Sequence, residues 1–117
     1  ADKILDLQNL VRKVPASSHV ISYAVKLVRS SRPKESEALA FVKEWTEWGA
    51  GPRASQYLIL AAKARAVMDS RYVASVEDVR AVVPSILRHR IITNFKAQAE
   101  GITSLDIISH LLQEVKP

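Results

Sequence analysis

The sequence predicts an all-α fold, in which about six helices form a single bundle-like domain. Apolar residues recur at steps of three and four along most of the chain, which is typical of amphipathic helices. Alternation with a period of two is everywhere too short to predict a strand. The chain has 117 residues, of which 48% are hydrophobic, so residues 1–117 are predicted to form one domain around one core.

The first two predicted helices have recognisable start and stop signals. Residues 2–14 carry apolar side chains on one face, with Asp2 as the predicted N-cap and Pro15 as the stop. Ser17 or Ser18 is expected to cap a second helix that ends near residues 30–33. Its predicted buried stripe is Val20, Ile21, Ala24, Val25, Leu27 and Val28.

A third helix is predicted over residues 36–48. One face is apolar, and Trp45 and Trp48 are expected to be core anchors, because aromatic residues at helical spacing usually pack in the interior. The opposite face carries charged residues. The predicted inward face consists of Ala38, Phe41, Val42 and Trp45.

The fourth helix follows a Gly49-Ala50-Gly51 break and runs from Pro52 to about Ser70. Proline suits the first turn of a helix, since the backbone N–H that it lacks would be unpaired there. The segment is the most apolar in the sequence and rich in alanine. A helix that is apolar nearly all round is expected to be buried on most sides, so this one is predicted to be central.

The last third of the chain predicts a short extended piece over residues 71–73 and then two further helices. Ser75, with acidic residues in the next turn, caps one of them, and Pro84 predicts a kink or a new start. Residues 85–90 continue helically, whereas the pattern of residues 91–100 leaves their structure open. Thr103 caps the final helix.

The composition of the chain bears on its cellular location and on the kinds of partner it could bind. The net charge of +5 is compatible with an acidic partner without requiring one. The chain has no cysteine, which excludes disulfides and thiolate chemistry and agrees with a cytoplasmic location. No apolar run reaches membrane-spanning length. The chain begins without methionine, directly in a helical pattern, as a piece of a longer protein would.

Arg53 is the first candidate functional residue. It falls in the first turn of the fourth helix, where the helix dipole disfavours a cation. A cation combined with the free amides of that turn would suit an anion such as phosphate. The alternative is a solvated surface arginine.

Arg88, His89 and Arg90 form a compact basic cluster with two readings. One is a solvated helix end, where positive charge is favourable, and the other is a second anion or subunit-interface contact. No phosphate-binding loop or hydrolase motif is present, so no independent active site is predicted. The histidines are too scattered to predict a metal site.

Four runs of residues are similar, in order and spacing, to the C-terminal helical lid of MoxR-type AAA+ ATPases. The runs are residues 7–15 (LQNLVRKVP), 48–55 (WGAGPRAS), 87–91 (LRHRI), and 94–95 with 100–103 (NF and EGIT). The resemblance covers nearly the whole chain. The lids of magnesium-chelatase subunits are related, but residues 48–55 look more like MoxR.

The resemblance implies a role for each residue of the Gly-Pro-Arg motif. Arg53 would be the second sensor, the catalytic arginine that approaches the γ-phosphate of ATP and couples lid position to nucleotide state. Gly51, Pro52 and Ala54 would complete this nucleotide-binding element. Whether Arg53 serves its own subunit or a neighbour stays open.

The resemblance also implies what lies outside the chain. Residues 1–15 would lead from an ATPase core that binds ATP and Mg²⁺, and the lid alone would hold neither and would not be catalytic. The partners would be that core, neighbouring subunits of a homo-oligomeric ring, and client proteins remodelled in a chaperone-like way. One departure is visible, since Ser70-Arg71 stands where relatives often have Gly-Arg.

The alternative function is a stand-alone helical module that binds an acidic partner or forms oligomers. Its basis is the net charge of +5 and the cluster at residues 88–90. Nucleic acid is disfavoured as the partner, because the basic residues are dispersed and no aromatic residues interleave with them.

Overall fold

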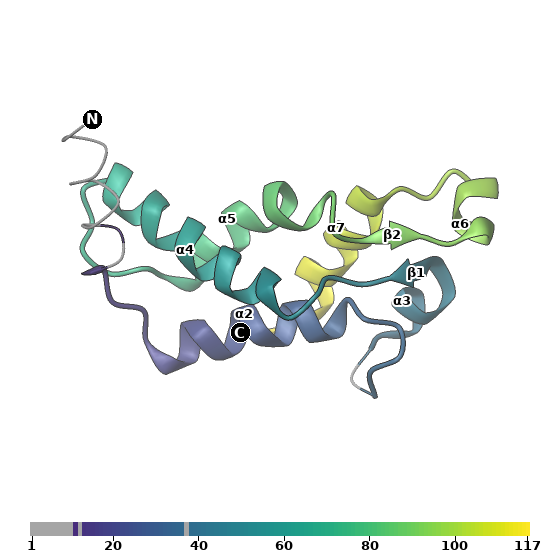
Figure 1. Ribbon diagram of the computed structural model, residues 1–117, viewed down its shortest axis with the longest axis horizontal. Coiled ribbons are helices and arrows are strands. Elements are labelled where there is room, and N and C mark those ends of the chain that lie inside the picture. Colours follow the sequence, from purple (N-terminus) through teal and green to yellow (C-terminus); the bar gives the residue numbers. More distant parts are fainter. Residues whose placement is uncertain (1–10, 12, 37) are drawn as a thin grey trace.

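The computed structural model describes residues 11, 13–36 and 38–117. The described residues form an arrangement that is mainly helical, as predicted, with one small sheet (Figure 1). The predicted helix over residues 2–14 lies mostly outside them. The helices are α2 (Ser18–Ser30), α3 (Ala40–Trp45), α4 (Arg53–Met68), α5 (Val76–Leu87), α6 (Phe95–Ala99) and α7 (Ser104–Glu114), and the strands are β1 (Thr46–Trp48) and β2 (Ile92–Thr93).

The predicted N-caps Ser17, Ser75 and Thr103 are confirmed, whereas the predicted N-cap Asp2 lies outside the described residues. The Ser17 hydroxyl accepts a hydrogen bond from the N–H of Val20 at the start of α2. Ser75 and Thr103 each form a complete capping box with an aspartate three residues later. These bonds pair amide groups that the first turn of a helix leaves free, so the local sequence defines where α2, α5 and α7 begin.

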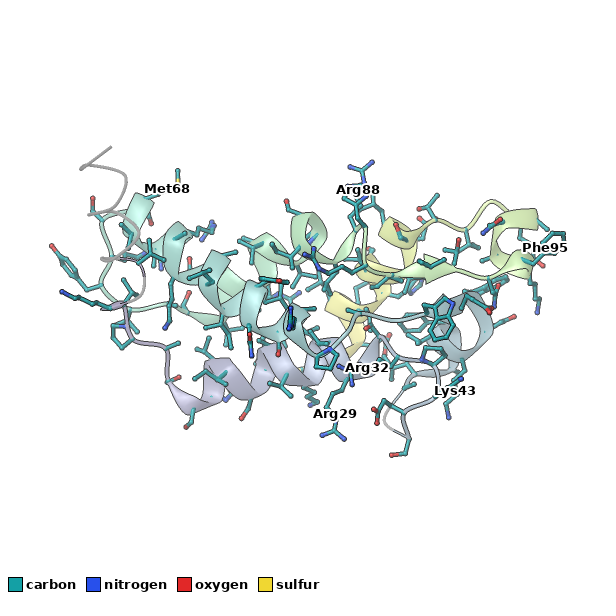
Figure 2. All side chains as sticks on the ribbon, viewed as in Figure 1. Arg29, Arg32, Lys43, Met68, Arg88 and Phe95 are labelled. Carbon is teal, nitrogen blue, oxygen red and sulfur yellow. The ribbon has the colours of Figure 1, made fainter. Side chains whose placement is uncertain are left out.

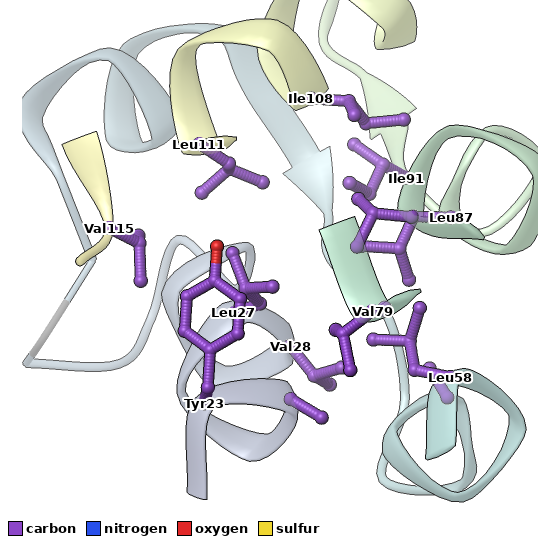
Figure 3. Packing of buried hydrophobic residues seen from close by; sticks show 14 of the residues in the cluster. Tyr23, Leu27, Val28, Leu58, Val79, Leu87, Ile91, Ile108, Leu111 and Val115 are labelled. Carbon is purple, nitrogen blue, oxygen red and sulfur yellow. The ribbon is translucent and has the colours of Figure 1, made fainter. Parts of the chain in front are cut away.

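The core lies where α2, α4, α5 and α7 meet. Tyr23 and Leu27 of α2, Leu58 of α4, Leu87 of α5 and Leu111 of α7 are all buried, and Figure 3 shows them converging. α4 packs most extensively against α5. Two members of the predicted α2 stripe were wrong: Ile21 and Val25 are exposed.

The predicted third helix was too long. α3 ends at Trp45, and residues 46–48 form β1 instead, which pairs antiparallel with β2. The pairing partner lies far away in the sequence, so local periodicity could not reveal this sheet. Trp45 packs partly buried against the core as predicted, but Trp48 is 59% exposed and is not a core anchor.

α4 is less buried than predicted. Its fully buried residues form one stripe at every fourth position, whereas Leu60 and Met68 are exposed. Apolar residues surround this helix almost evenly, so the sequence could not distinguish the packed face from the solvent face. The buried stripe is Ala54, Leu58, Ala62 and Ala66.

The segment after α4 resolves two further expectations. α5 runs from Val76 to Leu87 as one helix that includes Pro84, so the predicted new start at this proline was wrong. The undecided residues 91–100 form β2 and then α6, whose N-cap is Asn94. The sheet, α3 and α6 lie together at one end of the molecule, away from the turn that joins α4 to α5 (Figure 1).

Candidate functional site

Arg53 is the first residue of α4, and Pro52 before it already has helical dihedral angles (φ −59°, ψ −31°). The prediction that a helix begins at this step is confirmed to within one residue. The Arg53 side chain is exposed, and among the described residues it has no hydrogen bond or ion pair. A guanidinium at this position is therefore available to an outside ligand.

The break before α4 is held rigidly against the end of α2. The N–H of Ala50 donates to the Ser31 hydroxyl at 3.1 Å, and Arg32 Nε donates to the Ala50 carbonyl at 2.8 Å. A Cβ on Gly49 would lie only 2.3 Å from the Ser31 carbonyl oxygen, so only glycine permits this approach. The loop thereby fixes the position from which Arg53 projects.

The other residues of the predicted nucleotide-binding motif, Gly51, Pro52 and Ala54, differ in their exposure to solvent. Gly51 is exposed, and its carbonyl accepts from the N–H of Ala54 at 3.0 Å. Pro52 is exposed at the helix start, while Ala54 is buried in the core. Gly51 and Pro52 could thus contact a ligand directly, whereas Ala54 can only support the helix that carries Arg53.

A groove of about 400 Å³ borders the same loop. The exposed Trp48 ring is one of its walls, and the Lys34 ammonium lies 5.6 Å from the centroid of that ring. This volume lies within the range of small-molecule sites. This groove was not predicted from the sequence, because Trp48 was expected to be in the core. Further lining residues are Arg32, Gly49, Ala50, Gly51 and Pro52.

The basic cluster divides into two parts. Arg88 and His89 are exposed in the turn after α5, and Figure 2 shows Arg88 projecting away from the helices. Arg90 is also exposed, but its guanidinium carbon lies 4.9 Å from the centroid of the Tyr57 ring on α4. A cation–π contact therefore connects Arg90 with the helix that Arg53 begins. Among the described residues, neither Arg88 nor His89 makes such a contact with a ring of this helix.

A buried carboxylate, that of Asp78, binds two arginine side chains near the C-terminal end of α4. Asp78 is fully buried and accepts hydrogen bonds from Arg71 Nη1 and Arg65 Nη1, both at 2.7 Å. The Arg71 guanidinium lowers the pKa of Asp78 below its ordinary value of 3.8, against desolvation, with help from Ser75 and Arg65. The same pairing raises the pKa of Arg71. The sequence predicted Asp78 only as an acid in a first helical turn.

Ser70 precedes this network in a left-handed conformation, with φ of 55°. Serine is disfavoured there and glycine is not. Ser70 therefore adopts, at this Gly-Arg position, a conformation that glycine would take without strain. Arg71, the second residue of the motif, makes the contact with Asp78.

None of the helices among the described residues combines the length and apolarity needed to cross a membrane. No three histidine, cysteine, aspartate or glutamate side chains within this part of the chain are close enough together to hold a metal ion.

The chain is similar to two curated proteins and one solved structure. It is 34% identical over 121 residues to "Chaperone MoxR1" of Mycobacterium tuberculosis, which covers 98% of this chain and 32% of that protein. It is 30% identical over 110 residues to "Uncharacterized protein YeaC" of Bacillus subtilis, covering 94% and 32%. A crystal structure titled a "putative ATPase" from Cytophaga hutchinsonii superposes with a TM-score of 0.86 at 35% identity, covering 92% and 33%.

A family model described as the AAA lid domain matches residues 39–111. The chain belongs to this family, as a lid of the MoxR type. The matched range contains α4 with Arg53, the Asp78 network and the sheet. The chain spans about a third of the length of the relatives that it matches.

Several motif residues of this AAA lid have structural roles. The Asn94 side chain accepts from the N–H of Ala97 at 2.8 Å to cap α6 and donates to the Glu44 carbonyl at 2.7 Å. Gly101 has φ of 77°, which glycine adopts freely. These residues shape the end of the AAA lid, whereas Arg53, Arg88 and Arg90 are described motif residues with exposed side chains.

Proposed function

We propose that Arg53 is the nucleotide-sensing arginine of a MoxR-type AAA+ ATPase. The observation that carries this proposal is an exposed guanidinium, without a partner among the described residues, on the first residue of a 16-residue helix. Arginine stays charged at all relevant pH values, and its planar fork pairs with two phosphate oxygens at once. Gly51 and Pro52, which precede it in the chain, are also exposed.

The anchoring of the loop supports a sensor rather than a merely solvated side chain. A group that responds to the γ-phosphate must be held in a fixed position relative to its domain, so that binding moves the whole lid. Hydrogen bonds from Ala50 and Arg32 provide such a mount. The charge that Arg53 contributes would stabilise the transferring phosphoryl group.

The rest of the proposal concerns the full-length protein. It would bind ATP and Mg²⁺ mainly through a core outside this chain, hydrolyse ATP, and form a ring of identical subunits in the cytoplasm. Its action on clients would be chaperone-like, as the name of the Mycobacterium tuberculosis relative suggests. Arg53 would reach the nucleotide of its own subunit or of the next one.

The test uses the full-length protein with Arg53→Ala and Arg53→Lys. We expect the alanine variant to lose about tenfold or more in kcat/KM for ATP, because a charge-assisted contact with phosphate is lost. The lysine variant should retain part of the activity. Lys43→Ala is the matched control, since Lys43 is an exposed cation on α3. Wild-type kcat and KM in Arg53→Ala would reject the sensor role.

A further inference from the structure

Arg90 is held against α4 by two contacts. Its guanidinium carbon lies 4.9 Å from the centroid of the Tyr57 ring, within the range of a cation–π interaction. Its Nη1 donates to the Ile86 carbonyl at 2.6 Å. Arg90 belongs to the turn after α5, so the stack brings an arginine from another part of the chain onto the surface of the helix that Arg53 begins.

Tyr57 is four residues after Arg53 on α4, which places the two on the same face, about 6 Å apart at their Cβ atoms. Side chains on a helix lean toward its N-terminus, so the Tyr57 ring covers the turn that Arg53 begins. A guanidinium stacked on that ring therefore lies on the same side of α4 as Arg53. Tyr57 as a residue is 41% exposed, so the site remains open.

Neither arginine forms an ion pair with the part of the chain that the structure describes. Two like charges on one side of a helix turn repel each other unless an anion lies between them. A carboxylate is satisfied by one guanidinium fork, whereas the end of a triphosphate has more charge and more acceptor oxygens. Two guanidiniums therefore fit a nucleoside triphosphate better than a single acidic side chain.

We propose that Arg90 is a second phosphate-binding arginine of the Arg53 site and that Tyr57 is its positioning residue. This inference rests on the proposed function of Arg53 and assigns one member of the cluster at residues 88–90 to it. Arg88 projects away from the helices in Figure 2 and has no contact with Tyr57, so the same role does not extend to it.

The test measures affinities for ATPγS and ADP in the full-length protein by competition with a fluorescent ADP analogue. Arg90→Ala should weaken ATPγS binding about tenfold, with less than a twofold change for ADP, because the contact is made to the γ-phosphate. Arg88→Ala removes the same charge two positions away and should change the affinity for ATPγS less than twofold. In the double variant Arg53→Ala/Arg90→Ala, the two losses should not be additive.

Tyr57 gives a separate readout. Tyr57→Phe keeps the ring and should retain wild-type affinity for ATPγS, whereas Tyr57→Leu removes the stacking surface and should reproduce part of the loss seen in Arg90→Ala. Thermal unfolding of each variant identifies any loss of fold. If Arg90→Ala does not fold, Arg90→Gln replaces it, and wild-type affinity for ATPγS in that variant overturns the proposal.

The outcomes separate this inference from the proposed function. Weak ATPγS binding in Arg53→Ala together with wild-type binding in Arg90→Ala overturns only the role of Arg90. Wild-type binding in Arg53→Ala overturns the sensor role and this inference with it. Equal losses in Arg88→Ala and Arg90→Ala would show a general charge effect and also overturn the assignment of Arg90.

Discussion

The backbone N–H of Ala50 donates a hydrogen bond of 3.1 Å to the hydroxyl of Ser31. This bond joins the end of α2 to the loop that precedes α4, across residues that are far apart in the sequence. It leaves no room for a side chain at the neighbouring Gly49. The position of Arg53 thus depends on a contact between the end of α2 and the loop before α4, and not on α4 alone.

Gly49→Ala is expected to destabilise the 117-residue chain by about 2 kcal/mol, because the new Cβ overlaps backbone atoms at Ser31 and Arg32 that cannot move independently. Urea unfolding monitored by circular dichroism measures this change. Gly51→Ala is the matched control, since a Cβ there meets nothing within 4 Å, and it should change stability by less than about 0.5 kcal/mol. Equal stability of the two variants would contradict the close approach at Gly49.

Asp78→Asn is expected to destabilise the chain by about 3 kcal/mol, because it removes the charge that two arginines share in a buried position. Asp69→Asn is a useful comparison, since Asp69 also pairs with Arg71 but its side chain is 73% exposed. The loss of stability in Asp69→Asn should be below about 1 kcal/mol. Urea unfolding at pH 7 compares the two, and similar losses would argue against a special role for the buried carboxylate.

The stability of the chain should fall in acid. The pKa of Asp78 is lower in the folded chain than its ordinary value of 3.8, so the unfolded state binds more protons as the pH falls. This contribution is complete above about pH 5 and is lost as the pH decreases through the unfolded pKa toward the folded one. Asp106, whose pKa is also lowered, contributes in the same direction.

The urea midpoint, followed from pH 7 to pH 3, measures this effect. Wild type should lose more stability over that range than Asp78→Asn, while Asp106 titrates in both proteins. Parallel curves for the two proteins would contradict the assignment of the acid sensitivity to Asp78.

Ser70→Gly should stabilise the chain by about 0.5–1 kcal/mol, because φ of 55° is strained for serine and free for glycine. The same substitution at Ser85, an exposed position inside α5, should destabilise by a similar amount, about 0.5–1 kcal/mol. Melting temperatures of the two variants should therefore shift in opposite directions. A decrease for both would show that the backbone at Ser70 is not strained.

Thr46→Val should stabilise the chain by about 1 kcal/mol. The Thr46 hydroxyl is, among the described residues, a buried side-chain group without a hydrogen-bond partner. Valine keeps the shape and removes the unpaired group. Thr46→Ser keeps the hydroxyl, loses a buried methyl group and should destabilise. A loss of stability in Thr46→Val would indicate that the hydroxyl is paired in solution.

Elements that depend on local signals could be predicted from the amino-acid sequence. Ser75 and Thr103 start helices because a side-chain oxygen followed by an aspartate three residues later pairs the free amides of the first turn. Pro52 marked the start of α4 because its φ angle suits a first turn. Arg53 could therefore be identified as a candidate from its neighbours alone.

The covered surfaces and the contacts between distant groups became apparent from the folded arrangement of the helices. Trp48 lies in a strand and not in the predicted helix, because β1 pairs with β2 and places Trp48 opposite Ile92. The spacing of apolar residues near Trp48 does not encode this pairing. Leu60 is exposed because a helix apolar on all sides does not indicate which side packs. The contacts of Arg90 with Tyr57 and of Arg71 with Asp78 form because α4 packs against α5. Contacts between separate elements depend on how the helices dock, and the neighbouring residues in the sequence do not reveal them.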